Sequence, residues 1–371
     1  MTPDRTKKES PRVISPREDV ALIEGYYSPQ LDVDVRLNTN EAPEPPPPGF
    51  LKAVEEEFEA IALNRYPDRG AHELREAIAA FHGVDASQVY CANGSNEVLQ
   101  SILLAYGGSG RVAVTFEPTY AMHAHIARVT GTTVISGERD EKFAIDKEEF
   151  ERVLKAASGF GEENPAVSFI CSPNNPTGQI EAKAIISFVL ERAPGLVVVD
   201  EAYGQFAPRS ALEDFAGSPN LVVVRTFSKT WSLAALRLGY AITTPKIVGC
   251  LEAVTLPYHL DALKQAAGRV ALRYDAPMRG RVSRLVEERG HVTAELLDLG
   301  VSVCPSDANF VLIRPNAKKT AREIWEALLE RSVLVRDVSS WPRLSGYLRV
   351  TIGTREENEA FLRALREVLL T

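Results

Sequence analysis

The chain has 371 residues, of which 45% are hydrophobic and 25% charged, as in a globular protein with one large or two modest domains. A formal net charge of −8 without a basic stripe argues against nucleic acid as a partner. No apolar run approaches the roughly 20 residues of a membrane-spanning helix, so we expect no membrane partner either.

The four cysteines, Cys91, Cys171, Cys250 and Cys304, are far apart and mostly inside apolar runs. No CxxC pair is present, which argues against a zinc ribbon or a redox site, and we predict no metal site. The simpler interpretation is buried free thiols in a reducing compartment. Residues 1–19 are charged and contain no apolar core, so we expect no signal peptide and a cytoplasmic protein.

The chain is predicted to begin with a short strand, a stiff connection and two amphipathic helices. Apolar residues recur at helical spacing in both helices, and four consecutive prolines stiffen the connection. In chain order these elements are Val35–Asn38, Pro45–Pro48, Leu51–Leu63 and Ala71–Phe81.

From about residue 88, buried strands alternate with helices. The predicted strands are Gln88–Ala92, Arg111–Phe116, Thr132–Ile135, Ala166–Cys171, Leu196–Val199 and Leu221–Val224. The predicted helices between them are Asn96–Tyr106, Tyr120–Val129, Lys147–Ala156 and Ile180–Arg192. This alternation predicts an α/β fold, a mostly parallel sheet with helices on both faces.

After Lys246 the pattern changes to helices followed by short strands, which predicts a second, smaller α+β domain. The N-terminal end has no place in the large sheet. We therefore expect a large domain over residues 46–250, and a small domain formed by residues 1–45 and 251–371. Its predicted elements are Lys246–Val254, Leu260–Arg273, Arg279–Leu297, Val301–Cys304, Ala308–Ile313, Ala321–Leu329, Val333–Val335, Tyr347–Thr351 and Glu356–Leu370.

The stretch Val222–Tyr240 places a lysine just beyond a buried strand. Because burial disfavours the ammonium form, such a lysine can become a nucleophilic amine. Ser228 and Arg237 flank Lys229, and both residue types bind phosphate, one through a hydroxyl and one through a guanidinium. A buried lysine next to phosphate-binding residues indicates pyridoxal phosphate, an aldehyde cofactor with a phosphate group. The plainer interpretation is that most lysines in Ser-Lys pairs are solvated surface charges.

Four further features follow predicted strands, where ligands bind in open α/β sheets. Each has a plain structural explanation: a helix cap, a packed tyrosine, a turn, or a buried carboxylate paired with Arg, Lys or a metal. As a cofactor site, the same features supply phosphate donors, a stacking ring, an amide and a carboxylate for a pyridinium nitrogen. They are Gly94–Glu97, Tyr120, Ser172–Gly178 with Asn175, and Asp200–Tyr203. Their common order and spacing with Lys229 favour the cofactor interpretation.

Six motifs complete the pattern: Leu37–Glu41, Asn64–Pro67, Ser172–Gly178, Asp200–Tyr203, Thr226–Lys229 and Leu348–Gly353. Through them the chain resembles, from about Tyr26 to its C-terminus, the fold-type I pyridoxal-phosphate aminotransferases. Within that family it is most similar to the group that acts on histidinol phosphate. The lysine with an arginine eight positions later is common to the wider family, whereas Arg65–Pro67 and the two arginines Arg336 and Arg349 indicate the narrower group.

The resemblance implies a role for each matching residue. Lys229 is expected to bind the cofactor covalently and then to act as the general acid and base of the proton shift. Asp200 is expected to pair with the pyridine nitrogen. The other implied cofactor contacts are Ser95, Asn96, Ser228 and Arg237 at the phosphate, Asn175 and Tyr203 at the phenolic oxygen, and Tyr120 on the ring.

A homodimer with shared sites is also implied, because Tyr66 matches a tyrosine that reaches into the neighbouring subunit's site. Tyr26 matches a substrate-contacting tyrosine, although Tyr27 takes that position after a small shift in register. The resemblance also implies that Asn40 contacts the substrate.

On the substrate side, the resemblance implies that Arg349 binds the α-carboxylate of glutamate and, together with Arg336, the phosphate of histidinol phosphate. Two guanidinium groups suit a dianion better than a carboxylate alone. The plainer interpretation of Arg336 is a surface ion pair with the adjacent Asp337.

The chain departs from the family at two places. Asn40–Pro43 reads Asn-Glu-Ala-Pro where the family usually has Asn-Glu-Asn-Pro, and the proline run follows it. Trp231 stands where a smaller aromatic residue is common. Both are expected near the mouth of the active site, so they bear on the substrate and not on the cofactor.

The sequence thus predicts a homodimeric transaminase that uses small-molecule substrates, interconverting histidinol phosphate and 2-oxoglutarate with imidazole acetol-phosphate and glutamate, in histidine biosynthesis. One alternative on the same scaffold is an aromatic amino-acid transaminase, and a further one is a decarboxylase of a phosphorylated amino acid. A ligand-sensing regulator would need a DNA-binding module, for which the ~45 residues before Pro46 are too few.

Overall fold

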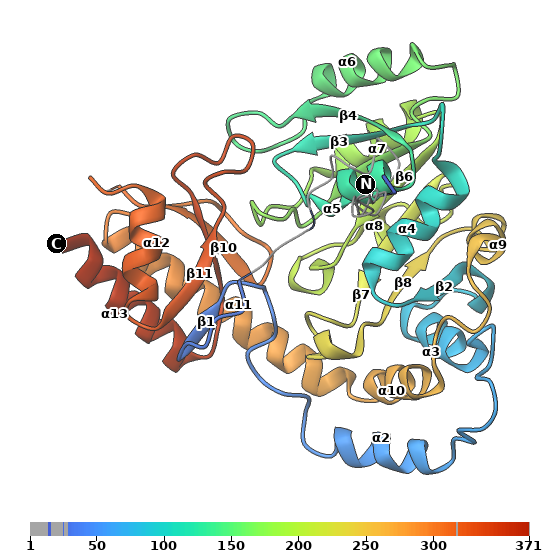
Figure 1. The fold of residues 1–371 in the computed structure, drawn as a ribbon, viewed down its shortest axis with the longest axis horizontal. Helices are drawn as coiled ribbons and strands as arrows, with labels where there is room; N and C mark the ends of the chain where they lie inside the picture. Colours follow the sequence, from blue (N-terminus) through green and yellow to red (C-terminus); the bar gives the residue numbers. More distant parts are fainter. Residues whose placement is uncertain (1–13, 16–24, 26–28, 317, 371) are drawn as a thin grey trace, which may run out of the picture.

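The structure is a computed structural model that describes residues 14–15, 25, 29–316 and 318–370. Two sheets lie side by side, each covered by its own helices, and one long helix, α11 (Asp275–Asp298), runs from one sheet to the other (Figure 1). Across the described residues, no helix combines the length and the apolar character needed to cross a bilayer.

The larger sheet has seven strands in the described part of the chain, in the order β2-β8-β7-β6-β5-β3-β4. The neighbours from β7 to β4 pair in parallel, whereas β8 is antiparallel to both β2 and β7. The strands are β2 Val89–Ala92, β3 Val112–Glu117, β4 Thr133–Glu138, β5 Val167–Cys171, β6 Leu196–Asp200, β7 Leu221–Thr226 and β8 Gly239–Ile242. The predicted α/β fold with a mostly parallel sheet is confirmed.

Helices cover both faces of this sheet because its strands alternate between two apolar clusters. In β7, Val222 and Val224 pack with the helices of one face, and Val223 packs with those of the other. The first face carries α4 Ser95–Tyr106, α5 Met122–Val129 and α9 Pro245–Val254. The second carries α6 Lys147–Ser158, α7 Lys183–Arg192 and α8 Ala211–Asp214, with α2 Phe50–Glu59, α3 His72–His82 and α10 Ala262–Leu272 over β2 and β8.

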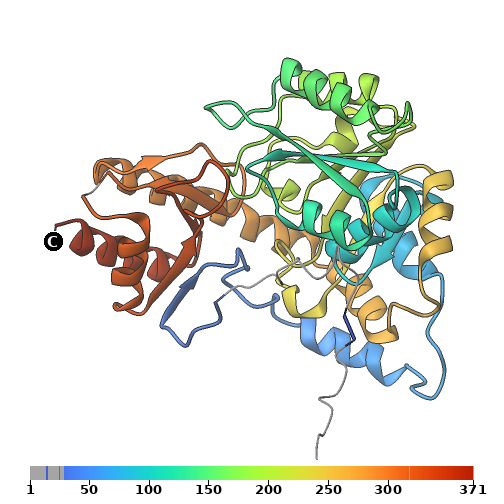
Figure 2. The ribbon, with the colours of Figure 1, turned by 45° about the horizontal axis from the view of Figure 1, so that its top comes forward.

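The smaller sheet has the order β1-β11-β12-β10-β9, with α11, α12 and α13 packed on it. Its first strand comes from the N-terminal part of the chain and pairs in parallel with β11, and Figures 1 and 2 both show this blue segment beside the red strands. The elements are β1 Val35–Leu37, β9 Ser302–Val303, β10 Phe310–Arg314, β11 Val333–Asp337, β12 Leu348–Thr351, α12 Ala321–Leu329 and α13 Arg355–Leu370.

The expected domain division, residues 46–250 against 1–45 with 251–371, stays a prediction. After residue 250, α10 still packs on α2 and α3 beside the larger sheet. The transition occurs along α11, where Val282 packs against the apolar clusters of both sheets.

A close helix contact gives a stability prediction. In α10, a Cβ on Gly268 would lie 2.6 Å from Leu238 Cδ2 and 2.8 Å from Leu74 Cδ1. We expect Gly268→Ala to lower the free energy of unfolding by about 1–3 kcal/mol, because overpacking outweighs the gain of about 1 kcal/mol in helix propensity. Urea unfolding measures the change.

Gly290→Ala is the matched control, because Gly290 lies in α11 and nothing lies within 4 Å of its added Cβ. This substitution is expected to raise the free energy of unfolding by about 0.5–1 kcal/mol. Equal stabilisation by both substitutions would contradict the tight contact of α10.

Candidate active site

The carboxyl ends of β2, β5, β6 and β7 open into one cavity, which the segment after β1 closes from the other side. Of the sequence-predicted site residues that the structure describes, all but Tyr66 and Arg336 line it. The lining residues are Thr39, Asn40, Ser95, Asn96, Tyr120, Cys171, Asn175, Asp200, Ala202, Tyr203, Thr226, Ser228, Lys229, Arg237 and Arg349.

Lys229 lies in the turn after β7, and its amine points toward the segment that closes the cavity. Nζ donates a hydrogen bond to the carbonyl oxygen of Thr39 at 3.0 Å. Burial is the main cause that lowers the pKa of Lys229 to about 7; the guanidinium groups of Arg349 and Arg237 contribute to the lowering, and the carboxylate of Glu41 opposes it. The side chain is thus a candidate nucleophile and proton carrier at neutral pH.

An anion site is formed where α4 begins. No side chain caps its first turn, which starts at Gly94 with φ 82°, so the helix start can take up an anion. Arg237 NH1 donates to Ser228 Oγ at 3.2 Å, which in turn accepts from Thr226 Oγ1 at 3.0 Å. A Cβ on Gly94 would lie 2.8 Å from Arg237 NH2, so the glycine permits the guanidinium to lie over the helix start.

Asp200, at the end of β6, is paired with a histidine and not with the Arg, Lys or metal considered from the sequence. His123 Nε2 lies 2.9 Å from Asp200 Oδ2, and the other carboxylate oxygen accepts from the Ala202 N–H at 3.0 Å. Both side chains are buried, and His123 stacks on Phe169 with 4.7 Å between ring centroids. Among the described residues, no cluster of His, Cys, Asp and Glu could hold a metal ion.

His123 was missed by sequence reasoning. The signal available was its place in α5, three positions after Tyr120, on a helix that is otherwise mostly apolar on its buried side. Tyr120 and His123 meet edge to face at 5.5 Å, and the Tyr120 hydroxyl donates to Asn96 Oδ1 at 3.2 Å. Tyr120 and Asp200 therefore line the cavity, and the buried His123 contacts both of them without lining it.

The opposite wall comes from the segment after β1 and from the smaller sheet. Asn40, which has φ 55°, donates from Nδ2 to the Tyr203 hydroxyl at 2.9 Å and accepts from Thr351 Oγ1 at 3.0 Å. Burial raises the pKa of Tyr203 to about 12, so its hydroxyl keeps its proton. The tyrosine can therefore donate a hydrogen bond into the cavity.

Arg349 brings a second guanidinium into the site and, unlike Arg237, is buried. Its NH1 donates to Asn175 Oδ1 at 2.6 Å and its NH2 to the Asn38 carbonyl oxygen at 2.8 Å. Arg336 lies directly opposite Arg349 across β11 and β12, with its guanidinium 5.8 Å from the ring centroid of Trp341. Like charges directly opposite in a sheet repel, so this arrangement favours a bound anion.

The structure does not place Tyr66 in the cavity of its own chain. Its side chain is 79% exposed and stacks on Tyr258 at 4.4 Å with 15° between the ring planes. Tyr26 and its alternative Tyr27 lie outside the described residues.

Neither Ala42 nor Trp231 lines the cavity, and for Trp231 the expected place near the mouth was wrong. Trp231 is buried in the apolar cluster between α3, α10 and the sheet, against Phe227 and Phe81. The side chain of Trp231, two positions after Lys229, thus fixes the turn by packing into the apolar core. Ala42 and Pro43 line a separate cavity on the outer side of β1.

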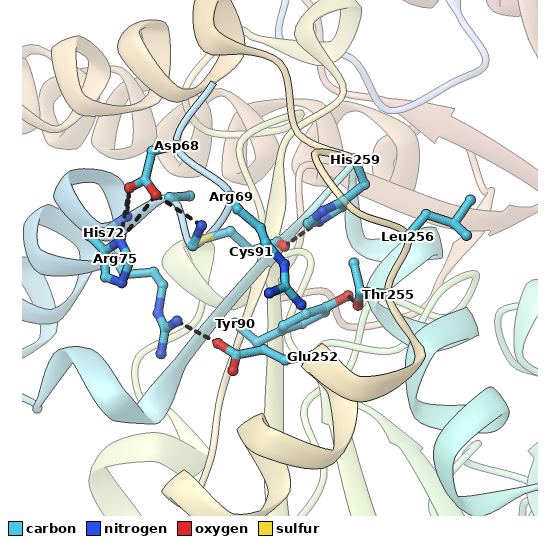
Figure 3. A pocket seen from close by; sticks show the side chains of 12 residues that line it. Asp68, Arg69, His72, Arg75, Tyr90, Cys91, Glu252, Thr255, Leu256 and His259 are labelled. Atoms are coloured by element: carbon cyan, nitrogen blue, oxygen red, sulfur yellow. Dashed lines mark hydrogen bonds and ion pairs between the residues drawn. The ribbon is translucent and has the colours of Figure 1, made fainter. Parts of the chain in front are cut away.

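A second, charged cavity lies between α3, β2 and the C-terminal end of α9 (Figure 3). Its polar groups are paired with each other: Asp68 accepts from the His72 backbone N–H at 2.6 Å, and Arg75 NH1 lies 2.6 Å from Glu252 Oε1. Figure 3 shows Leu256 at its rim, pointing away from this network. No residue predicted for chemistry lies among its lining groups, so this cavity is not the candidate active site.

The chain is similar to known proteins both in sequence and in structure. The profile of the family "Aminotransferase class I and II" matches residues 33–365. The histidinol-phosphate aminotransferases of Corynebacterium diphtheriae and Streptomyces avermitilis are 43% and 46% identical to the chain, over 95% and 92% of it and 96% and 93% of their own lengths. The solved histidinol-phosphate aminotransferase of Sinorhizobium meliloti in complex with pyridoxal-5'-phosphate has a TM-score of 0.84 and 23% identity, covering 98% of this chain and 99% of that one.

The low pKa of Lys229 can be tested by competitive acetylation of the ligand-free chain, read by peptide mass spectrometry. Only the neutral amine reacts, so we expect half-maximal reactivity at about pH 7, well below that of a model amine with the ordinary lysine pKa of about 10.4 in the same tube.

Two variants check the cause in opposite directions. Arg349→Met removes a positive neighbour and is expected to raise the midpoint, whereas Glu41→Gln removes a negative neighbour and is expected to lower it. Shifts of the same sign in both variants would contradict the electrostatic explanation.

Proposed function

The chain belongs to the class I and II aminotransferase family, and from that premise we propose that it interconverts histidinol phosphate and 2-oxoglutarate with imidazole acetol-phosphate and glutamate. Of these substrates, histidinol phosphate is the one in the names of its curated relatives. The observation that carries the proposal is the arginine pair, Arg336 opposite Arg349, beside the cavity that holds Lys229.

A second guanidinium distinguishes a phosphorylated substrate from an ordinary amino acid. One arginine in a forked hydrogen bond neutralises a carboxylate, whereas a phosphate monoester carries nearly two charges at neutral pH. Arg349 alone suffices for glutamate and 2-oxoglutarate. Arg336 supplies the additional charge when the phosphorylated substrate enters in the second half of the exchange.

The residues of the cavity fit pyridoxal 5'-phosphate, the cofactor of this proposal. The uncapped start of α4, with Ser228 and Arg237, suits the phosphate, and Gly94 leaves the space that the guanidinium needs. Asp200 suits the pyridine nitrogen, since a buried carboxylate stabilises a cationic ring. When bound, the cofactor supplies an aldehyde and an electron-withdrawing ring.

Around that group, each side chain has a separate task in the proposal. Lys229 Nζ would accept and return the proton at the reacting carbon, which its pKa of about 7 permits in both directions. His123 holds Asp200 in place through the 2.9 Å hydrogen bond. Tyr120 would stack on the ring of the cofactor, Asn175 and the protonated Tyr203 would bind its phenolic oxygen, and Asn40, which donates to Tyr203, would contact the substrate.

We also propose a homodimer in which Tyr66 completes the phosphate site of the partner subunit. Tyr66 lies on an exposed apolar surface, which marks an interaction site. Leu51 of α2, Leu63 and Leu256 are 75%, 75% and 77% exposed in the single chain. On the predicted apolar side of α2, Leu51 and Phe58 are exposed, whereas Val54 packs on the core of the same subunit, and a second copy would cover the exposed residues.

The proposed location is the cytoplasm. The four cysteines are free thiols, as expected in a reducing compartment.

The substrate is tested with glutamate, histidinol phosphate and phenylalanine as amino donors. We expect histidinol phosphate to be used well and Arg336→Gln to raise its KM by about 10–100-fold, since a charge-assisted contact is worth about 1.5–3 kcal/mol. The reaction with glutamate is expected to change by less than about 3-fold, because Arg349 remains.

Arg314→Gln is the control, because Arg314 also places its guanidinium near an aromatic ring, that of Tyr347, but lies opposite Ser302 and not opposite Arg349. It is expected to leave every KM unchanged. Preferred turnover of phenylalanine would favour the aromatic transaminase, and release of carbon dioxide without a 2-oxo acid would favour the decarboxylase.

Shared sites are tested by mixing subunits of two inactive variants. In a shared site, Lys229 comes from one subunit and Tyr66 from the other. Half of the randomly formed dimers contain one subunit of each variant, and one of the two sites in such a dimer has both wild-type residues. The mixture of Lys229→Ala and Tyr66→Ala is therefore expected to regain about a quarter of the wild-type sites. Lys229→Ala mixed with Asp200→Ala is the control, because both residues line the same cavity of one chain. Activity equal to the mean of the parents in both mixtures would refute the shared site.

A further inference from the structure

One buried guanidinium joins three parts of the chain behind Lys229. Arg281, in α11, is 4% exposed. Its NH1 donates to the carbonyl oxygen of Thr230 at 3.2 Å, and its NH2 donates to that of Pro45 at 2.8 Å. Its Nε lies 3.4 Å from a carboxylate oxygen of Glu44.

These contacts tether both ends of the hydrogen bond made by Lys229. Thr230 directly follows Lys229, the donor, and Pro45 follows Thr39, the acceptor, by six positions. The two segments are about 190 residues apart in the sequence. Arg281 therefore helps to fix the distance between the amine and the segment that closes the cavity.

The proline run provides a stiff anchor for this contact. Proline fixes φ near −65°, so the directions of the carbonyl groups from Pro45 onward vary little. A carbonyl held this way is a better-defined acceptor than one in a flexible loop. The departure from the family pattern after Asn40 thus has a physical use in this chain.

Keeping a cation here has a cost in stability. Burial lowers the pKa of Arg281, and its carboxylate partner, Glu44, is half-exposed and at the limit of hydrogen-bond distance. A buried charge with imperfect compensation destabilises a fold relative to an apolar side chain of similar size. Its presence is better explained by the two carbonyl groups that it orients than by stability.

We propose that Arg281 is a positioning residue for Lys229, holding the amine and the closing segment at the separation that proton transfer needs. The proposal rests on the transamination proposed above. Because Arg281 belongs to the helix that joins the two sheets, it also transmits any displacement of α11 to Lys229.

The test is Arg281→Lys in the full chain, since an ammonium cannot serve both carbonyl groups in the planar geometry of a guanidinium. In the holoenzyme we expect kcat to fall about 10–100-fold with less than about a 3-fold change in KM, as for a misplaced catalytic group. In the ligand-free chain, the acetylation midpoint of Lys229 is expected to rise, because a looser turn admits water.

Arg284→Lys is the matched control. Arg284 lies one turn along α11 and makes an ion pair with the same Glu44 at 2.8 Å, but it is exposed and contacts neither carbonyl group. Both kcat and the acetylation midpoint are expected to stay at wild-type values. If Arg284→Lys reproduces the effects, or if folded Arg281→Lys shows neither effect, the proposal is wrong.

Two further measurements separate a change in position from a loss of fold or of substrate. Circular dichroism shows whether Arg281→Lys is folded; if it is not, Arg281→Gln, whose amide can serve one carbonyl group, takes its place with the same expected results. The acetylation midpoint involves no substrate. It therefore tests the positioning even where the proposed substrate is wrong.

Discussion

The structure depends on the removal of one amine from water. Lys229 follows a strand that is buried on both faces, and burial together with the guanidinium groups of Arg237 and Arg349 lowers its pKa to about 7. In the proposed function the same two arginines would bind anions, one beside the start of α4 and one opposite Arg336. Anion binding and activation of the amine are therefore linked, because any anion that neutralises a guanidinium also changes how strongly the amine holds its proton.

Parallel strands explain why the site lies where it does. The carboxyl ends of β5, β6 and β7 carry Asn175, Asp200 and Lys229 to one edge of the sheet. That edge alone would leave the amine open to water. The chain closes it with residues 38–45, which extend from β1 in the smaller sheet, so the cavity requires both sheets.

The sequence was sufficient for the parallel sheet and for much of the cavity because both depend on local patterns. Strands buried on both faces are continuous apolar runs, and a polar residue directly after such a run lies at the ligand edge. β8 was not predicted because it has only four residues, begins at a glycine and is antiparallel to its neighbours. The turn residue Trp231 was misplaced because an aromatic residue near a catalytic lysine can face either the ligand or the core, and only packing decides.

The residues that sequence reasoning missed are those whose partners are remote in the chain. His123 meets Asp200 across 77 positions, and Arg281 meets Pro45 across 236. Neither lies in a motif, since each acts on a catalytic residue and not on a ligand. The strand-end residues determine which chemistry the cavity can perform, and these remote contacts determine how precisely its groups are held. In the proposed transamination, proton transfer by Lys229 would depend steeply on distance, so the second set would affect the rate as directly as the first, although it touches no substrate.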